Sequence, residues 1–264
     1  MPGGVLMTLT SGSSHFHAFG KLPARADFVD TGLSAATRRA MDVWLQDGIA
    51  ESQREYGTSW RQIYLEAPIW RFILPWGMCG PVTILGVISP SHDSVGRCYP
   101  LLMATEIPSP VNTIGLIAGS NRWFGAVEAL ALDARDPTFD SSELYRRLLP
   151  RWRTGEVKPI RTFPTSISGR EGLAVELPML SAGPAMAHML CREAPAERGL
   201  WWTAGSTRVP PMLAIIPKLT SPLGFTAFLD GKWTRHGWDH RPLIPDAPTP
   251  ETGAPAVADW DREA

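Results

Sequence analysis

The residues best suited to chemistry lie in one polar stretch, residues 90–100, with the sequence PSHDSVGRCYP. Strongly apolar runs flank it on both sides, as is typical of a loop held between two core strands. Ser91 or Ser94, together with His92 and Asp93, would supply the three groups of a hydrolytic triad. A working triad needs three side chains that converge in a line of hydrogen bonds, which adjacent residues rarely achieve, and neither serine of the stretch lies in a G-x-S-x-G elbow. The composition therefore indicates a polar site, and the spacing argues against a triad.

A second polar loop, GKLPARADF, carries charges that match those of the first: Lys21, Arg25 and Asp27. It lacks the G-x-x-x-x-G-K-[ST] spacing of a phosphate-binding P-loop. We expect the two loops to meet, with Arg97 forming a bidentate ion pair with Asp27. Asp93 is expected to pair with Arg25 or Lys21, and to accept hydrogen bonds from its own loop's backbone as an Asx-turn. On this interpretation the charged residues form a structural lock.

Aromatic residues near the charges allow a second interpretation, a surface that binds a protein partner. Arg71 would face away from Trp70 on its strand, because successive side chains alternate between the two faces. Trp201 and Trp202 likewise point to opposite faces, so at most one is expected to be fully buried, and the other would line a groove beside the loops. The candidate partner-binding residues are Lys21, Arg25, Asp27, Trp70, Arg71, Ser91, Asp93, Arg97, Trp201 and Trp202.

The histidines and cysteines do not predict a metal site, and no cofactor is expected. His15 and His17 share one face of an expected strand, but no third ligand stands near them in the sequence. His236 and His240 lie four residues apart, with glycine and proline around them that do not favour a helix. The three cysteines are widely spaced and odd in number, so reduced core thiols fit better than a disulfide framework.

The elements that must hold the two loops alternate between helix and strand. Helical spacing of apolar residues extends over 34–56, and a shorter helix is expected at 58–65. Strands at 69–74, 82–88 and 101–105 would form an antiparallel meander around the polar stretch. Further strands are expected at 15–19, 172–177, 200–205, 212–216 and 225–229, and further helices at 112–133, 141–152 and 183–192.

Composition places the chain among ordinary globular proteins. Its 264 residues are 44% hydrophobic and 19% charged, with a net charge of −1, which gives no basic footprint for nucleic acid. No apolar run approaches the roughly 18–20 residues of a membrane helix, and the first residues do not resemble a signal peptide, so a cytoplasmic location is expected. We expect a flexible N-terminus (1–14), one domain (15–241) and a disordered, acidic, proline-rich tail (242–264).

Four blocks, in this order, resemble the TagF family, also called ImpM, of type VI secretion-associated proteins. They are GKLPxRxDFV from Gly20, PxWRF from Pro68, PSxDxVGRxxPL from Pro90 and LWWTxG from Leu200. The likeness is strong over residues 16–107 and weaker to about residue 233. Ala26 stands where the family commonly has glycine, and Tyr99 where it commonly has phenylalanine, which affects the fine shape of any groove.

The resemblance implies both a fold and a role. The fold is a single α/β domain whose mixed, largely antiparallel sheet has helices on both sides, a three-layer arrangement. The role is that of a bacterial, cytoplasmic, non-enzymatic accessory protein that represses assembly of the secretion system post-translationally. Its implied partner is the forkhead-associated scaffold protein, and components of a serine/threonine phosphatase pathway are further candidates. The alternative is a small-ligand-binding domain or hydrolase that uses Asp27, Asp93 and Arg97.

Overall fold

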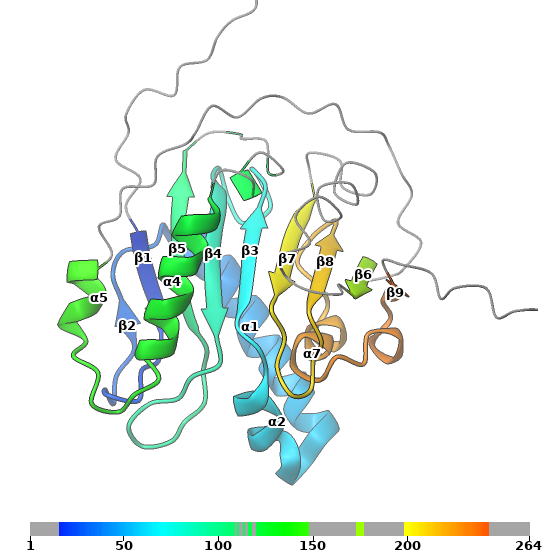
Figure 1. The fold of residues 1–264 in the computed structure, drawn as a ribbon, viewed down its shortest axis with the longest axis horizontal. Coiled ribbons are helices and arrows are strands. Elements are labelled where there is room, and N and C mark those ends of the chain that lie inside the picture. The colour runs from blue at the N-terminus through cyan, green and yellow to red at the C-terminus, as the bar shows by residue number, and fades with distance from the viewer. Residues whose placement is uncertain are drawn as a thin grey trace, which may run out of the picture.

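The computed structural model describes residues 16–108, 110, 113, 116–117, 120–147, 173–176 and 198–242 (Figure 1). The expected N-terminal segment 1–14 and helix 183–192 lie outside this range, as does the expected tail except for its first residue. The elements are β1 (Phe16–Gly20), β2 (Val29–Asp30), α1 (Ala35–Tyr56), η1 (Gly57–Ser59), α2 (Trp60–Glu66), β3 (Trp70–Leu74), β4 (Thr83–Ser89), β5 (Leu101–Ile107), α4 (Asn121–Asp133), α5 (Ser142–Arg147), β6 (Leu173–Glu176), β7 (Gly199–Thr203), β8 (Met212–Ile216), α7 (Pro222–Asp230), η2 (Thr234–His236) and β9 (Asp239–Pro242).

A nine-stranded sheet in the order β2-β1-β5-β4-β3-β7-β8-β6-β9 forms the centre of the molecule. Every neighbouring pair is antiparallel except β6 and β9, which are parallel. The expected meander is confirmed, because β3, β4 and β5 lie side by side and the polar stretch joins β4 to β5. The second polar loop joins β1, the other neighbour of β5, to the short strand β2. The two loops therefore leave the sheet close together.

Helices cover both faces of the sheet, which confirms the three-layer α/β fold. In Figure 1, α4 and α5 lie in front of the sheet, and α1, α2 and α7 lie behind it. Alternation along β3 divides the core accordingly: Trp70 and Phe72 pack toward α1 and α7, whereas Ile73 packs toward α4. With both faces covered, strands such as β4 are buried at every position, which explains their continuous apolar sequence.

The long helix α1 begins and ends where its sequence predicts. The Ser34 hydroxyl accepts a hydrogen bond from the Thr37 backbone N–H, as an N-cap does, and Gly57 follows the last helical residue. Gly48 lets α7 approach closely, because a Cβ at this position would lie 2.3 Å from the Phe225 ring. The α1–α7 layer is therefore packed too tightly for any larger side chain there.

The strand expected at 225–229 is wrong: these residues form the middle of helix α7. Ser221 accepts a hydrogen bond from the Gly224 N–H, Pro222 occupies the first turn, and Gly231 ends the helix in the left-handed conformation. All seven residues of α7 from Gly224 to its end are buried. A helix that is apolar on every side has no 3.6-residue pattern, so its composition resembles that of a buried strand.

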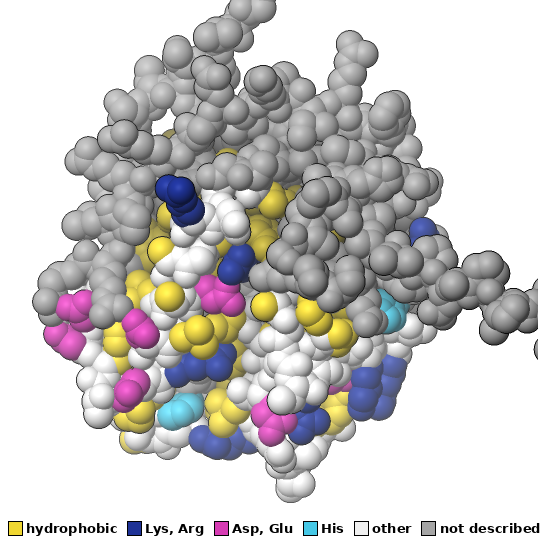
Figure 2. Space-filling model, in the orientation of Figure 1, with side chains coloured by type: hydrophobic (Ala, Val, Ile, Leu, Met, Phe, Trp, Pro, Cys, Tyr) yellow, Lys and Arg dark blue, Asp and Glu magenta, His cyan; other side chains and the backbone are white. Residues whose placement is uncertain are grey.

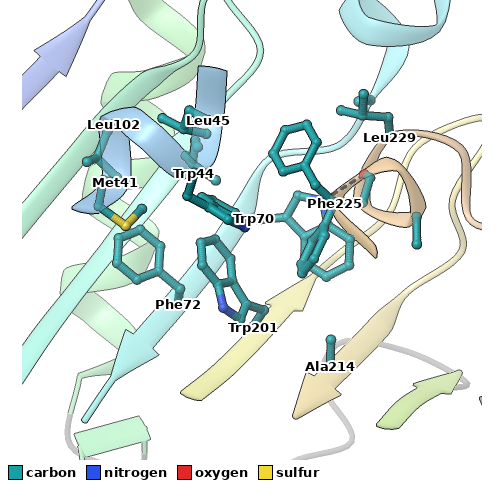
Figure 3. Packing of buried hydrophobic residues seen from close by; sticks show 14 of the residues in the cluster. Met41, Trp44, Leu45, Trp70, Phe72, Leu102, Trp201, Ala214, Phe225 and Leu229 are labelled. Carbon is teal, nitrogen blue, oxygen red and sulfur yellow. Dashed lines mark hydrogen bonds between the residues drawn. The ribbon is translucent and has the colours of Figure 1, made fainter. Parts of the chain in front are cut away.

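Aromatic rings fill the layer between the sheet and α1 with α7. Trp44 of α1 lies between Trp201 and Phe225, with ring centroids 5.3 Å and 5.0 Å away. Trp201 stacks on Phe72 at 4.6 Å, and the Trp70 indole donates a hydrogen bond to the Phe228 carbonyl oxygen at 3.0 Å (Figure 3). Burial of each large side chain contributes about 1.5–3 kcal/mol, so this cluster rigidly supports the strands from which the polar loops emerge.

Candidate functional site

The two polar loops meet at Asp93, which is completely buried. Its Oδ2 accepts hydrogen bonds from the Lys21 ammonium at 2.8 Å and from Arg97 Nε at 2.6 Å. Its Oδ1 accepts the backbone N–H groups of Val95 at 3.1 Å and Arg97 at 2.8 Å. Oδ1 thus closes the β4–β5 loop on itself, and Oδ2 ties that loop to the β1–β2 loop.

Four donors around one carboxylate make it strongly acidic. Burial alone would raise the pKa of Asp93, but the hydrogen bonds from Lys21 and Arg97 favour the charged form and hold the pKa below its ordinary value. Asp93 is therefore ionised at neutral pH. We call Asp93, Lys21 and Arg97 the charge lock.

A ring of backbone contacts surrounds the charge lock. Ser91 Oγ donates to the Lys21 carbonyl oxygen at 2.8 Å, and the Ser91 N–H and carbonyl both bond to the buried Tyr64 hydroxyl of α2. The Arg97 side chain also donates to the Ala26 carbonyl oxygen at 2.9 Å. These contacts fix the loops to each other and to α2, so the charge lock is part of the fold's framework.

Close backbone approach accounts for the first glycine of the second loop. Gly20 has φ of +135°, and a Cβ there would lie 2.0 Å from the Pro100 carbonyl oxygen. Only glycine fits a position that requires both this dihedral angle and this contact. The end of β1 is thereby pressed against the end of the β4–β5 loop, which brings Lys21 within reach of Asp93.

Of the two ion pairs expected between the loops, one is confirmed and the other is wrong. Asp93 pairs with Lys21 and forms the expected Asx-turn. Asp27 is exposed, and Arg97 pairs with Asp93 instead. The side chain of Arg25 is exposed, and its carbonyl oxygen, which accepts the Ser94 N–H at 2.9 Å, provides the contact between the loops. Arg97 makes its ion pair inside its own loop because Asp93 lies four residues before it and the turn folds it back.

Ser91, His92 and Asp93 do not line up as a triad. The Ser91 hydroxyl points to the Lys21 carbonyl, and His92 Nδ1 lies 2.8 Å from the Asp93 backbone oxygen, not from its carboxylate. A groove of about 510 Å³ lies elsewhere, between α1 and the start of α7, where Ala36, Ala40, Val43, Leu219 and Pro222 line it with Arg39, Trp44, Asp47 and Thr220.

The two adjacent tryptophans are both buried, which corrects the prediction that at most one would be. Trp201 packs against Phe72 on the α1 side, and Trp202 packs against Phe124 of α4, with ring centroids 4.7 Å apart. Trp70 is also buried. Each face of the sheet has its own helical layer, so residues that alternate between faces all enter a core. Trp70 and Trp201 line only a small pocket of about 30 Å³ among the described residues, and both are almost completely buried.

Arg71 faces away from Trp70, as expected, and binds Glu128 of α4. Its Nε donates to Glu128 Oε2 at 2.7 Å, and the two side chains are 13% and 20% exposed. The ion pair anchors α4 to the sheet. The sequence did not single out Glu128, because nothing in one sequence tells which helical carboxylate lies above a given strand.

A second buried polar network was also missed. The carboxylate of Asp230 accepts hydrogen bonds from the Tyr56 hydroxyl and lies 2.8 Å from His236 Nε2, with Glu55 3.7 Å from the other ring nitrogen. Burial and the Asp230 carboxylate raise the pKa of Tyr56 above its ordinary range. The network joins the ends of α1 and α7 to η2. Its only sequence signal was a histidine in a segment otherwise rich in aromatics.

Among the residues that the structure describes, no three His, Cys, Asp or Glu side chains are grouped to hold a metal ion, and none of the described helices has the length and apolarity to cross a bilayer. On the face seen in Figure 2, basic and acidic side chains are interspersed. Nucleic-acid binding would instead need a basic field.

Comparisons with known proteins agree with the fold. A family model described as the TagF N-terminal domain, type VI secretion system-associated, matches residues 17–149, half of the chain, and includes both polar loops. The chain is also similar to the crystal structure of PA0076 from Pseudomonas aeruginosa PAO1, with a TM-score of 0.66 and 29% identity over 88% of this chain and 100% of that one. Among curated proteins, none matches.

Proposed function

Because the chain belongs to the TagF family of type VI secretion-associated proteins, we propose that it is a non-enzymatic regulator of that system. It represses assembly post-translationally by binding the forkhead-associated scaffold protein in the cytoplasm. Components of a serine/threonine phosphatase pathway that acts on the same scaffold are further candidate partners of this protein. The mechanism is sequestration: a rigid surface of this protein holds the scaffold away from the components on which assembly begins.

The observation that carries the proposal is the state of Asp93. Both of its oxygens are engaged, one by two backbone amides and the other by Lys21 and Arg97. A general base or a ligand-binding carboxylate needs a free lone pair directed at the substrate. Both oxygens of Asp93 instead accept hydrogen bonds from groups of the protein itself. The arrangement favours a rigid binding surface over chemistry.

The alternative, a hydrolase or small-ligand domain that uses Asp27, Asp93 and Arg97, has less support. Asp27 is exposed and outside the charge lock, and the groove between α1 and the start of α7 is lined by none of the three residues. Ligand sites are usually concave and gather a few convergent polar groups. Here the polar groups converge on one another.

Binding and secretion test the proposal together. The purified full chain should bind the purified scaffold in isothermal titration calorimetry, and its overproduction in the native bacterium should reduce type VI secretion, while deletion should raise it. The proposal is refuted if the wild-type chain does not bind at concentrations up to about 100 μM. A Kd of that size corresponds to a binding free energy of roughly −5.5 kcal/mol. Trp202 is unsuitable as a binding probe, since it is buried and its truncation would report on folding.

A further inference from the structure

The two locked loops and α2 present five side chains that are exposed, although Arg97 also belongs to the charge lock and the Phe28 ring also packs against Tyr99. Two are apolar: Phe28 is 45% exposed, and Val95 is 68% exposed, the largest value among the large hydrophobic residues described. Three are basic and exposed: Arg25, Arg61 and Arg97. We call these five residues the loop surface.

Contacts bring the backbone of the two loops and the side chain of Arg61 close together. The Ser94 N–H donates to the Arg25 carbonyl oxygen at 2.9 Å, so the tip of one loop lies against the other. On the far side of the tip, a Cβ added to Gly96 would lie 3.9 Å from a terminal nitrogen of Arg61. Phe28 follows Arg25 by three residues in the same loop. The tip of the β4–β5 loop therefore lies against the backbone of Arg25 on the β1–β2 loop and near the side chain of Arg61 on α2.

The loop surface is positive although the chain as a whole has a net charge of −1. Lys21 is neutralised beneath the surface by Asp93. Arg97 shares the same carboxylate, so the two loops together with Arg61 carry four basic side chains against two carboxylates, Asp27 and Asp93. Clustered charge of one sign attracts a partner of the opposite sign and speeds its association.

The backbone of the tip is unavailable to a small anion. All four N–H groups from Ser94 to Arg97 are used within the protein: Ser94 bonds to the Arg25 carbonyl, Gly96 to the Asp93 carbonyl, and Val95 and Arg97 to the Asp93 carboxylate. Phosphate sites usually rely on such amides arranged as a nest. What the tip offers is arginine forks beside apolar side chains, the composition that recurs at protein–protein hot spots.

We infer that the loop surface is the docking site for a protein segment that carries carboxylates beside an apolar side chain. The inference rests on the proposed function and specifies the chemistry that the scaffold must present. The carboxylates pair with Arg25, Arg61 and Arg97, and the apolar side chain covers Val95 and Phe28. The charge lock beneath holds both loops in the bound conformation before the partner arrives, which lowers the entropy lost on binding.

Two pairs of matched variants test the inference in the full chain. Val95→Asp and Arg61→Glu change the loop surface. Val43→Asp and Arg39→Glu make the same changes in the α1–α7 groove, where Val43 is 52% exposed. Binding to the purified scaffold is measured by calorimetry, and each variant's unfolding midpoint in urea is compared with that of the wild type. The loop-surface variants should weaken binding about tenfold or more, and the groove variants less than about twofold.

Salt dependence gives a second measure. Raising salt from about 50 mM to about 500 mM should weaken wild-type binding, and Arg61→Glu should be less sensitive to salt, because screened charge pairs lose their attraction. Equal binding by all four variants, or loss only in the groove variants, overturns the inference and leaves the proposed function intact. Absence of wild-type binding instead refutes the proposed function. Retention of a duplex DNA oligonucleotide that Arg61→Glu abolishes would overturn the inference in favour of a nucleic-acid surface.

Discussion

Replacing Lys21 with methionine isolates the energy of the charge lock. Lys21 is 7% exposed, and its ammonium lies 2.8 Å from Asp93 Oδ2. Methionine has a similar length and fills the same space, but removes one charge-assisted hydrogen bond, which contributes about 1.5–3 kcal/mol. Arg97 and two backbone amides still bind Asp93, so the carboxylate is not left unpaired. We expect Lys21→Met to lower the free energy of unfolding by about 2 kcal/mol, and Tm by about 4–8 °C for a domain of this size.

The pH dependence of this loss identifies its cause. The folded pKa of Asp93 is depressed, whereas in the unfolded chain an aspartate titrates near about 3.9. The charge lock therefore contributes its full stability above about pH 4 and loses it as pH falls through the lower folded pKa. Lys21→Met brings the folded pKa of Asp93 closer to its ordinary value. The difference between wild type and variant should be largest near neutral pH and should shrink in acid.

Urea unfolding followed by tryptophan fluorescence measures both effects. Lys232→Met is the matched control: each lysine ammonium lies 5.4 Å from an aromatic ring, of Phe28 for Lys21 and of Tyr56 for Lys232, but Lys232 is exposed. The control should cost less than about 0.5 kcal/mol. An equal loss for both lysines, or a loss in Lys21→Met that stays constant from neutral to acid pH, would show that the ion pair with Asp93 does not stabilise the fold.

Three further outcomes follow from buried contacts. Gly86→Ala should destabilise the protein by about 1–3 kcal/mol in thermal unfolding, because the new Cβ would lie 2.5 Å from the Phe72 ring; an unchanged Tm would contradict the packing of β4 described above. Burial raises the pKa of Cys79 to about 12, so mass spectrometry should find this thiol unlabelled by maleimide at neutral pH until urea unfolds the chain, and rapid labelling of the folded protein would be inconsistent with its burial. Glu128→Gln should cost about 1–2 kcal/mol, since the ion pair with Arg71 is largely shielded from water; a loss as small as that of an exposed pair would mean that α4 is held without it.

Local signals in the sequence predicted several parts of this structure correctly. Helix α1 begins after Ser34 and ends before Gly57, as the capping preferences of these residues indicate. The three strands around the polar loop form the expected meander. The Asx-turn of Asp93 is also as predicted, and of the two partners expected for Asp93, Arg25 and Lys21, the structure selects Lys21. Such features depend on residues a few positions apart, or on two loops that adjacent strands must bring together, so a single sequence contains enough information to predict them.

Features that depend on layers could not be foreseen. Phe225 and its neighbours form a helix and not a strand, because complete burial removes the periodicity that distinguishes the two. Trp201 and Trp202 are both core residues because a helical layer covers each face of the sheet. Arg71 finds Glu128 for the same reason.

The charge lock was determined partly by the sequence and partly by the tertiary structure. Residue types alone indicated that two acid–base loops would meet, since Asp93, Arg97 and Lys21 complement one another in charge. Which carboxylate would be buried depended on the backbone: Gly20 presses the end of β1 against Pro100, and this contact places Lys21, rather than Arg25, beside Asp93. Asp27 lies outside the charge lock. Each oxygen of Asp93 already has its donors, and burial favours a carboxylate whose charge is fully compensated.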